Sequence, residues 1–173
     1  ALSINPDYDM GHNSLGNALH KIGQLEKARK SYEKALSINP GYAEVYFNLG
    51  NLMLDLNNLD EAALNYNYAL NLKPGIDCNF GNLFHTKMHL CSWGDFSRNL
   101  KELVKKINHN EKTISPFSLS ALVDDAKIQL KNAEIFAKEK FQKNIALSKI
   151  NKYSNCTKIR IGYFSADFRE HPV

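Results

Sequence analysis

Long apolar runs are missing from this sequence of 173 residues. None approaches the ~20 consecutive apolar residues that a membrane-spanning helix needs, so the sequence predicts no membrane partner. No basic segment followed by an apolar core marks a secretory signal, and we expect a cytoplasmic protein. Cysteine is scarce as well. The three cysteines, at positions 78, 91 and 156, are odd in number and widely spaced, which favours reduced thiols over disulfides or metal ligands.

Other signatures of binding chemistry are also absent. The net charge is only +4, and the basic residues do not alternate with aromatic ones, so we expect no nucleic-acid partner. No glycine-rich phosphate loop occurs, and we expect no cofactor in this chain. His85 and His89 have a spacing that can bind a metal, but the metalloprotease motif is missing because no glutamate follows His85. We favour packing or solvent-facing histidines over that alternative and predict no metal site.

What the sequence does contain is a repeat. ALSINP at 1–6 recurs at 35–40 and, as ALNLKP, at 69–74, so that Pro6, Pro40 and Pro74 stand 34 residues apart. Each unit has apolar residues at the i, i+3, i+4, i+7 spacing of two amphipathic helices. A unit of this length and pattern resembles the tetratricopeptide repeat. The predicted fold class is therefore all-α, an α-solenoid of stacked antiparallel helix pairs.

The chain is predicted to have four parts. Residues 1–74 hold the tail of one repeat and two full repeats, 75–110 a divergent capping repeat, 111–157 a helical connector, and 158–173 a strand followed by a loop. The β-branched and aromatic run after Lys158 predicts this strand. The expected helices span 9–22, 25–37, 43–56, 59–71, 77–90, 95–107, 118–122 and 125–144.

The repeated positions also predict how the helices pack. Small residues at Gly16 and Gly50 should let paired helices come close, while Leu and Tyr side chains fill the space between them (Leu15, Tyr32, Leu49 and Tyr66). The only tryptophan, Trp93, should plug the core. The long last helix should bury Ile128, Ala133, Phe136, Ala137 and Phe141. Because the repeat before the first pair is cut, we expect an exposed apolar face there and self-association through it.

Asparagines recur on the first helix of each repeat. Asn13, Asn17, Asn48, Asn51 and Asn82 are spaced to form a line along the inner, concave groove of a solenoid. Amides can hydrogen-bond a peptide backbone whatever its side chains are. The sequence therefore indicates a groove that holds an extended protein or peptide segment. The alternative is that the amides only face water in an asparagine-rich chain.

The last sixteen residues, KIRIGYFSADFREHPV, combine a predicted strand with a polar loop that carries an acid, an arginine and a histidine. In open α/β sheets, ligands bind beyond the carboxyl ends of strands, where Asp167, Arg169 and His171 fall. Spacing alone leaves a plain surface loop open as the alternative. Together with the repeats, CSWGDF at 91–96 and SPF at 115–117, the motif RIGYFSADFREHPV resembles the bacterial form of the O-linked N-acetylglucosamine transferase family.

That resemblance carries specific expectations. It implies a two-lobed GT-B fold of α/β type, of which residues 158–173 would be the first strand and loop, truncated here. It implies transfer of N-acetylglucosamine from UDP-GlcNAc to Ser or Thr of proteins that the repeats bind. His171 would be the catalytic histidine, with Pro172 after it, but the incomplete site should leave this 173-residue chain inactive by itself. The alternative is a non-catalytic repeat scaffold for protein–protein interaction.

Overall fold

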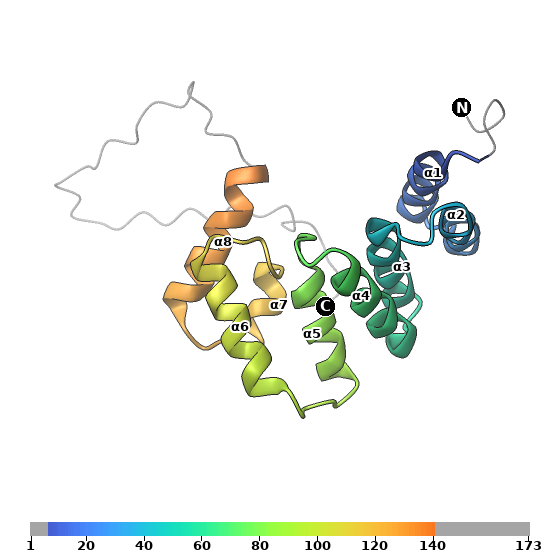
Figure 1. Ribbon diagram of the computed structural model, residues 1–173. Coiled ribbons are helices and arrows are strands. Elements are labelled where there is room, and N and C mark those ends of the chain that lie inside the picture. Colours follow the sequence, from blue (N-terminus) through green and yellow to red (C-terminus); the bar gives the residue numbers. More distant parts are fainter. Residues whose placement is uncertain (1–6, 141–173) are drawn as a thin grey trace, which may run out of the picture. The chain divides into compact units, whose positions relative to one another are not determined.

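The computed structural model describes residues 7–140, which form eight helices and no strand (Figure 1). The strand and loop predicted for 158–173 lie outside the described residues. All predicted helices are present, and none of their described ends is displaced by more than two residues. The helices are α1 (Asp9–Lys21), α2 (Leu25–Ile38), α3 (Ala43–Asp55), α4 (Leu59–Leu72), α5 (Asn79–His89), α6 (Phe96–Asn108), α7 (Pro116–Ser120) and α8 (Ala126–Lys140).

The first helix of every repeat ends in the same turn. Gly23, Asn57 and Cys91 follow α1, α3 and α5 and take left-handed φ values of 77°, 57° and 56°. In the first of these turns, Gln24 N–H donates to the Leu19 carbonyl at 2.9 Å, and the two later turns repeat this bond. Such a turn closes a helix by pairing its last free carbonyls. Its presence after α5 shows that this helix ends in the same way as α1 and α3.

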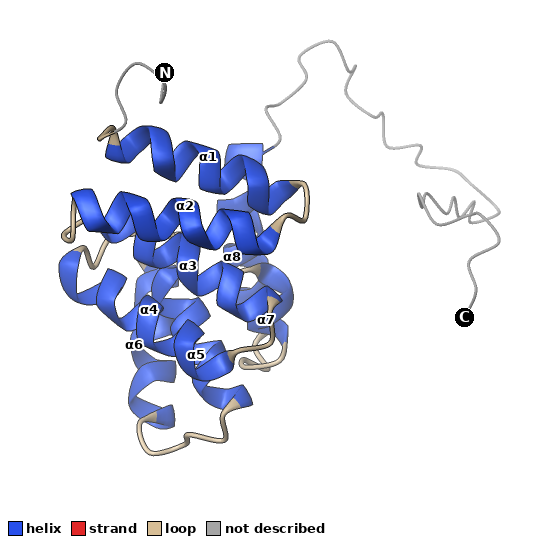
Figure 2. Cartoon of the chain, turned by 90° about the vertical axis from the view of Figure 1, so that its right-hand side faces the viewer, coloured by secondary structure: helices blue, strands red, loops and turns tan. Residues whose placement is uncertain are grey.

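Within each of the first two repeats, a glycine and a tyrosine interlock. Tyr32 on α2 and Tyr66 on α4 are fully buried. A Cβ atom on Gly16 would lie 2.5 Å from Tyr32 Cε1, and one on Gly50 would lie 2.5 Å from Tyr66 Cε1. Only glycine leaves room for the ring, so the predicted close approach is confirmed. The helices lie in antiparallel pairs, α1 on α2 and α3 on α4 (Figure 2).

The apolar face of the first pair is exposed, as expected. Leu49 is buried in the core shared by the first two repeats, but its counterpart Leu15 is 41% exposed. The prediction that Leu15 fills the space between helices is therefore wrong. The reason is its place in the stack, because no described helix pair precedes α1. Met10 and Ile22 on the same pair are 54% and 67% exposed.

The third pair packs differently because both members of the glycine–tyrosine pair are replaced. Phe84 stands at the position of Gly16 and Gly50, and Leu100 stands where the first two repeats have tyrosine. The Phe84 ring lies 5.4 Å from that of Phe96 and joins a second core instead of the first. Here α5 still packs on α4, but its contact with α6 is much smaller than those within the first two pairs.

The connector is fastened to this third pair. Lys112 and Thr113 accept backbone hydrogen bonds from Cys78 and Gly81, at the start of α5, at 2.8 and 3.1 Å. A side chain on Gly81 would collide with the Thr113 carbonyl oxygen. From the other side, Asn132 on α8 donates to the Ile114 carbonyl at 3.0 Å. The segment before α7 is thus held between α5 and α8, and one hydrophobic core runs through α5 to α8.

Two expectations about side-chain burial are wrong in this region. Trp93 touches Phe96, with ring centroids 5.7 Å apart, but remains 53% exposed, because the turn before α6 lies at the surface. On α8, Ile128 and Phe136 are half-buried as predicted, whereas Ala137 is exposed. The fully buried residue of this helix is Asn132, whose amide the apolar pattern could not identify. Phe141 lies outside the described residues.

Candidate peptide-binding site

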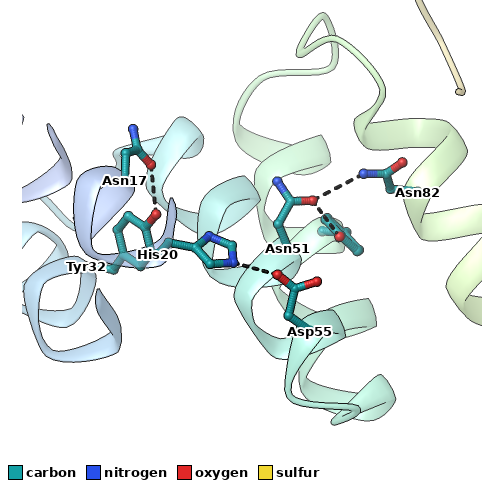
Figure 3. Close-up of polar contacts among 7 residues, drawn as sticks. Asn17, His20, Tyr32, Asn51, Asp55 and Asn82 are labelled. Carbon is teal, nitrogen blue, oxygen red and sulfur yellow. Dashed lines mark hydrogen bonds and ion pairs between the residues drawn. The ribbon is translucent and has the colours of Figure 1, made fainter. Parts of the chain in front are cut away.

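The five asparagines of the predicted line are half-buried on α1, α3 and α5, and bonds between repeats join two pairs of them. Asn48 Nδ2 donates to Asn13 Oδ1 at 2.9 Å, which links α3 to α1. Asn82 Nδ2 donates to Asn51 Oδ1 at 3.3 Å, which links α5 to α3 (Figure 3). We call these five amides on the first helices of successive repeats the asparagine strip.

Tyrosines from the second helices fix two of these amides. The Tyr32 hydroxyl donates to Asn17 Oδ1 at 2.7 Å, and the Tyr66 hydroxyl donates to Asn51 Oδ1 at 2.8 Å. Burial raises the pKa of Tyr32 to about 12 and that of Tyr66 further still, so both hydroxyls stay protonated and remain donors at neutral pH. Each tyrosine therefore holds the amide oxygen inward and leaves the amide nitrogen of the same asparagine pointing elsewhere.

The strip consequently keeps unused hydrogen-bonding groups of both kinds. Among the described residues, the Nδ2 groups of Asn17 and Asn51 make no hydrogen bond, nor do the Oδ1 atoms of Asn48 and Asn82. The two donors are 34 residues apart, and so are the two acceptors. An extended polypeptide presents backbone N–H and C=O groups in alternation. The arrangement can therefore pair with a backbone without reading its side chains.

The sequence predicted these asparagines, but not which of them bond to other repeats and which keep free hydrogen-bonding groups. Asn13 has no asparagine counterpart in the second repeat, where Phe47 occupies its position. It accepts from Asn48 and lies 3.4 Å from the Tyr42 hydroxyl, to which its Nδ2 donates, so it joins repeats instead of facing a ligand. The buried tyrosines were predicted only to fill space. The signal that could have revealed their polar role was the constant spacing of fifteen residues from each asparagine to its tyrosine.

Histidines flank the strip. His20 Nε2 lies 2.7 Å from Asp55 Oδ2, a further contact between the first two repeats (Figure 3). His85 takes the position of Asn17 and Asn51 in the third repeat. Its Nε2 lies 3.4 Å from that of His89. Burial, and secondarily the neighbouring His89, lower the pKa of His85, so this ring is neutral at pH 7.

The sequence analysis also made predictions about a catalytic histidine, a metal site and a membrane-spanning helix. His171 lies outside the described residues. Within residues 7–140, no three His, Cys, Asp or Glu side chains gather closely enough to hold a metal ion. None of the helices in that range is long and apolar enough to cross a membrane.

Comparison with protein-family models identifies the repeats. Residues 16–57 match a TPR repeat model, and residues 43–76 match the tetratricopeptide repeat. These segments are tetratricopeptide repeats. They include Asn17, Asn48 and Asn51, and proteins use such repeats to bind other proteins. A comparison with curated proteins found no match.

Proposed function

We propose that the tetratricopeptide repeats bind an extended segment of a partner protein along the asparagine strip. The observation that carries this proposal is the pair of amide nitrogens, on Asn17 and Asn51, that buried tyrosines hold outward at the repeat period. Free donors and acceptors at fixed intervals match the backbone of a peptide better than any single small molecule. Hydrogen bonds to the backbone give affinity, and the sequence of the bound segment is then set by other contacts.

The test uses fluorescein-labelled dodecamer peptides rich in Ser and Thr, with binding followed by fluorescence anisotropy. We expect Asn17→Ala combined with Asn51→Ala to weaken binding about tenfold or more, since each lost hydrogen bond costs ~0.5–1.5 kcal/mol. Asn71→Ala is the matched control, because Asn71 is an exposed asparagine on α4 away from the strip. Methylation of the peptide's backbone nitrogens should abolish binding. Equal affinity of wild type and double variant would refute the proposal.

We further propose that the bound segment is the substrate of a protein glycosyltransferase, which transfers N-acetylglucosamine from UDP-GlcNAc to Ser or Thr. Support comes from the resemblance of CSWGDF, SPF and RIGYFSADFREHPV to the O-linked N-acetylglucosamine transferase family, and His171 is the catalytic candidate. A second function, that of a non-catalytic scaffold, is favoured by the matched repeats themselves.

Sugar transfer separates these two functions. The protein that contains this sequence together with any catalytic lobe is incubated with labelled UDP-GlcNAc and a cell extract as acceptor. Label that appears on protein and disappears in His171→Ala supports the glycosyltransferase. Peptide binding without labelling, and without binding of the nucleotide, supports the scaffold.

Self-association is a separate proposal that rests on the exposed face of the first pair. Leu15 is 41% exposed there, whereas its counterpart Leu49 is buried between repeats, and exposed apolar surface can mark an interface. Sedimentation velocity of the chain across a concentration series should show a species heavier than the monomer. Leu15→Glu should remove it, and a monomer at every concentration would contradict the proposal.

A further inference from the structure

The Nε2 atoms of His85 and His89 lie close together on one side of α5. The two residues are four apart on α5, and their rings lie edge to face with centroids 4.5 Å apart. Their Nε2 atoms are 3.4 Å from each other. His89 is exposed and His85 half-buried, so the space in front of both nitrogens is open to solvent. The spacing along the chain already allowed a shared metal, and the structure adds the distance between the two nitrogens.

A distance of this size is what a tetrahedral metal requires of two imidazole ligands. With Zn–N bonds of ~2.0–2.1 Å and a tetrahedral angle, the two nitrogens must stand about 3.3–3.4 Å apart. The same separation also allows a weak hydrogen bond between the two rings while no ion is bound. The observed distance places both nitrogens within reach of one ion.

The pair is also particular to the third repeat. The positions of His85 and His89 hold Asn51 and Asp55 in the second repeat. Leu100 replaces the tyrosine that fixes Asn51, so no hydroxyl stands at that repeat position to hold the His85 imidazole as the amide is held.

We propose that His85 and His89 together bind one divalent transition-metal ion of the class that imidazole prefers, such as Zn²⁺ or Ni²⁺. Both rings would bind through Nε2 and carry their remaining proton on Nδ1. Water, or a donor atom from another molecule, fills the other positions of the ion. The site lies where the asparagine strip would continue into the third repeat, and it does not depend on the strip binding a peptide.

Isothermal titration calorimetry of the whole chain with ZnCl₂ and with NiCl₂ tests this proposal. We expect one ion per chain, and at least a tenfold loss of affinity in His85→Ala and in His89→Ala. His109→Ala is the control, because His109 is an exposed histidine at the end of α6 with no histidine partner on that helix. His89→Gln adds a variant that keeps a hydrogen-bonding side chain at an exposed position but removes the imidazole ligand.

A second readout identifies the ligands directly. Bound Cu²⁺ should show electron paramagnetic resonance splitting from two nitrogen nuclei in wild type and from one in His89→Gln. Circular dichroism confirms that each variant stays helical. The proposal is overturned if wild type binds neither ion at millimolar concentration. It is equally overturned if all variants bind as wild type does, which would place the ion at other groups such as the cysteines.

Discussion

Replacing Gly50 by alanine should destabilise the chain even though alanine is the better helix former. The added Cβ would lie 2.5 and 2.6 Å from two ring carbons of Tyr66 and 3.0 Å from a third. The ring cannot move aside easily, because it is fully buried and its hydroxyl is bonded to Asn51 at 2.8 Å. The collision therefore has to be relieved by separating α3 from α4.

The size of the effect follows from two opposing contributions. Alanine gains ~0.8–1.0 kcal/mol over glycine inside a helix. Overpacking a core typically costs ~1–3 kcal/mol, and a contact this short with a ring belongs at the upper end of that range. We therefore expect Gly50→Ala to lower the free energy of unfolding by about 1–2 kcal/mol.

Urea unfolding followed by circular dichroism measures this change. Gly75→Ala is the control, since nothing lies within 4 Å of a Cβ at that position. The cost of Gly50→Ala should vanish in a Tyr66→Leu background, which copies the leucine that the third repeat has at this position. The reasoning is refuted if Gly50→Ala is as stable as wild type, or if its cost is the same in both backgrounds.

Three further predictions concern buried polar groups. Tyr66→Phe should lower stability by ~1 kcal/mol, measured by urea unfolding, because it removes a hydrogen bond to Asn51, and an unchanged midpoint would contradict this. Asn132→Asp should lower the melting temperature far more than Asn132→Leu, since it sets a buried carboxylate against the Ile114 carbonyl. Because burial raises the pKa of Tyr32 to about 12, the unfolded chain loses this proton first, near pH 10. Stability should fall between pH 10 and 12, and less steeply in Tyr32→Phe; equal slopes would argue against the assignment.

The helices could be predicted because their signals are local and repeated. Apolar periodicity, the prolines that close each unit and the 34-residue register together placed every described helix within two residues. Packing between repeats was harder to predict. Leu15 and Leu49 occupy equivalent repeat positions, but within the described residues only Leu49 has a helix pair on both sides. Burial at a repeat position therefore depends on neighbours that the position itself does not encode.

The candidate site, too, could be predicted from the sequence only in part. The asparagines were recognisable because Asn17 and Asn51 recur in register. Which of their atoms are free could not be predicted, since that depends on hydroxyls contributed by other helices. The burial of Asn132 was missed for a similar reason, because its partner is a backbone carbonyl eighteen residues away. Periodicity predicts the face of a helix, whereas hydrogen-bond partners depend on tertiary contacts.

The interlock of glycine with tyrosine and the shared turn also make the repeat an interchangeable unit. Pro40 and Pro74 are both followed by glycine, so a copy of residues 41–74 inserted after Pro40 would begin and end at junctions that the chain already uses. Each inserted copy would carry its own Asn51 and Tyr66 and add one more outward amide at the same interval. The length of partner backbone that the chain can bind would then increase by the same amount with each inserted repeat.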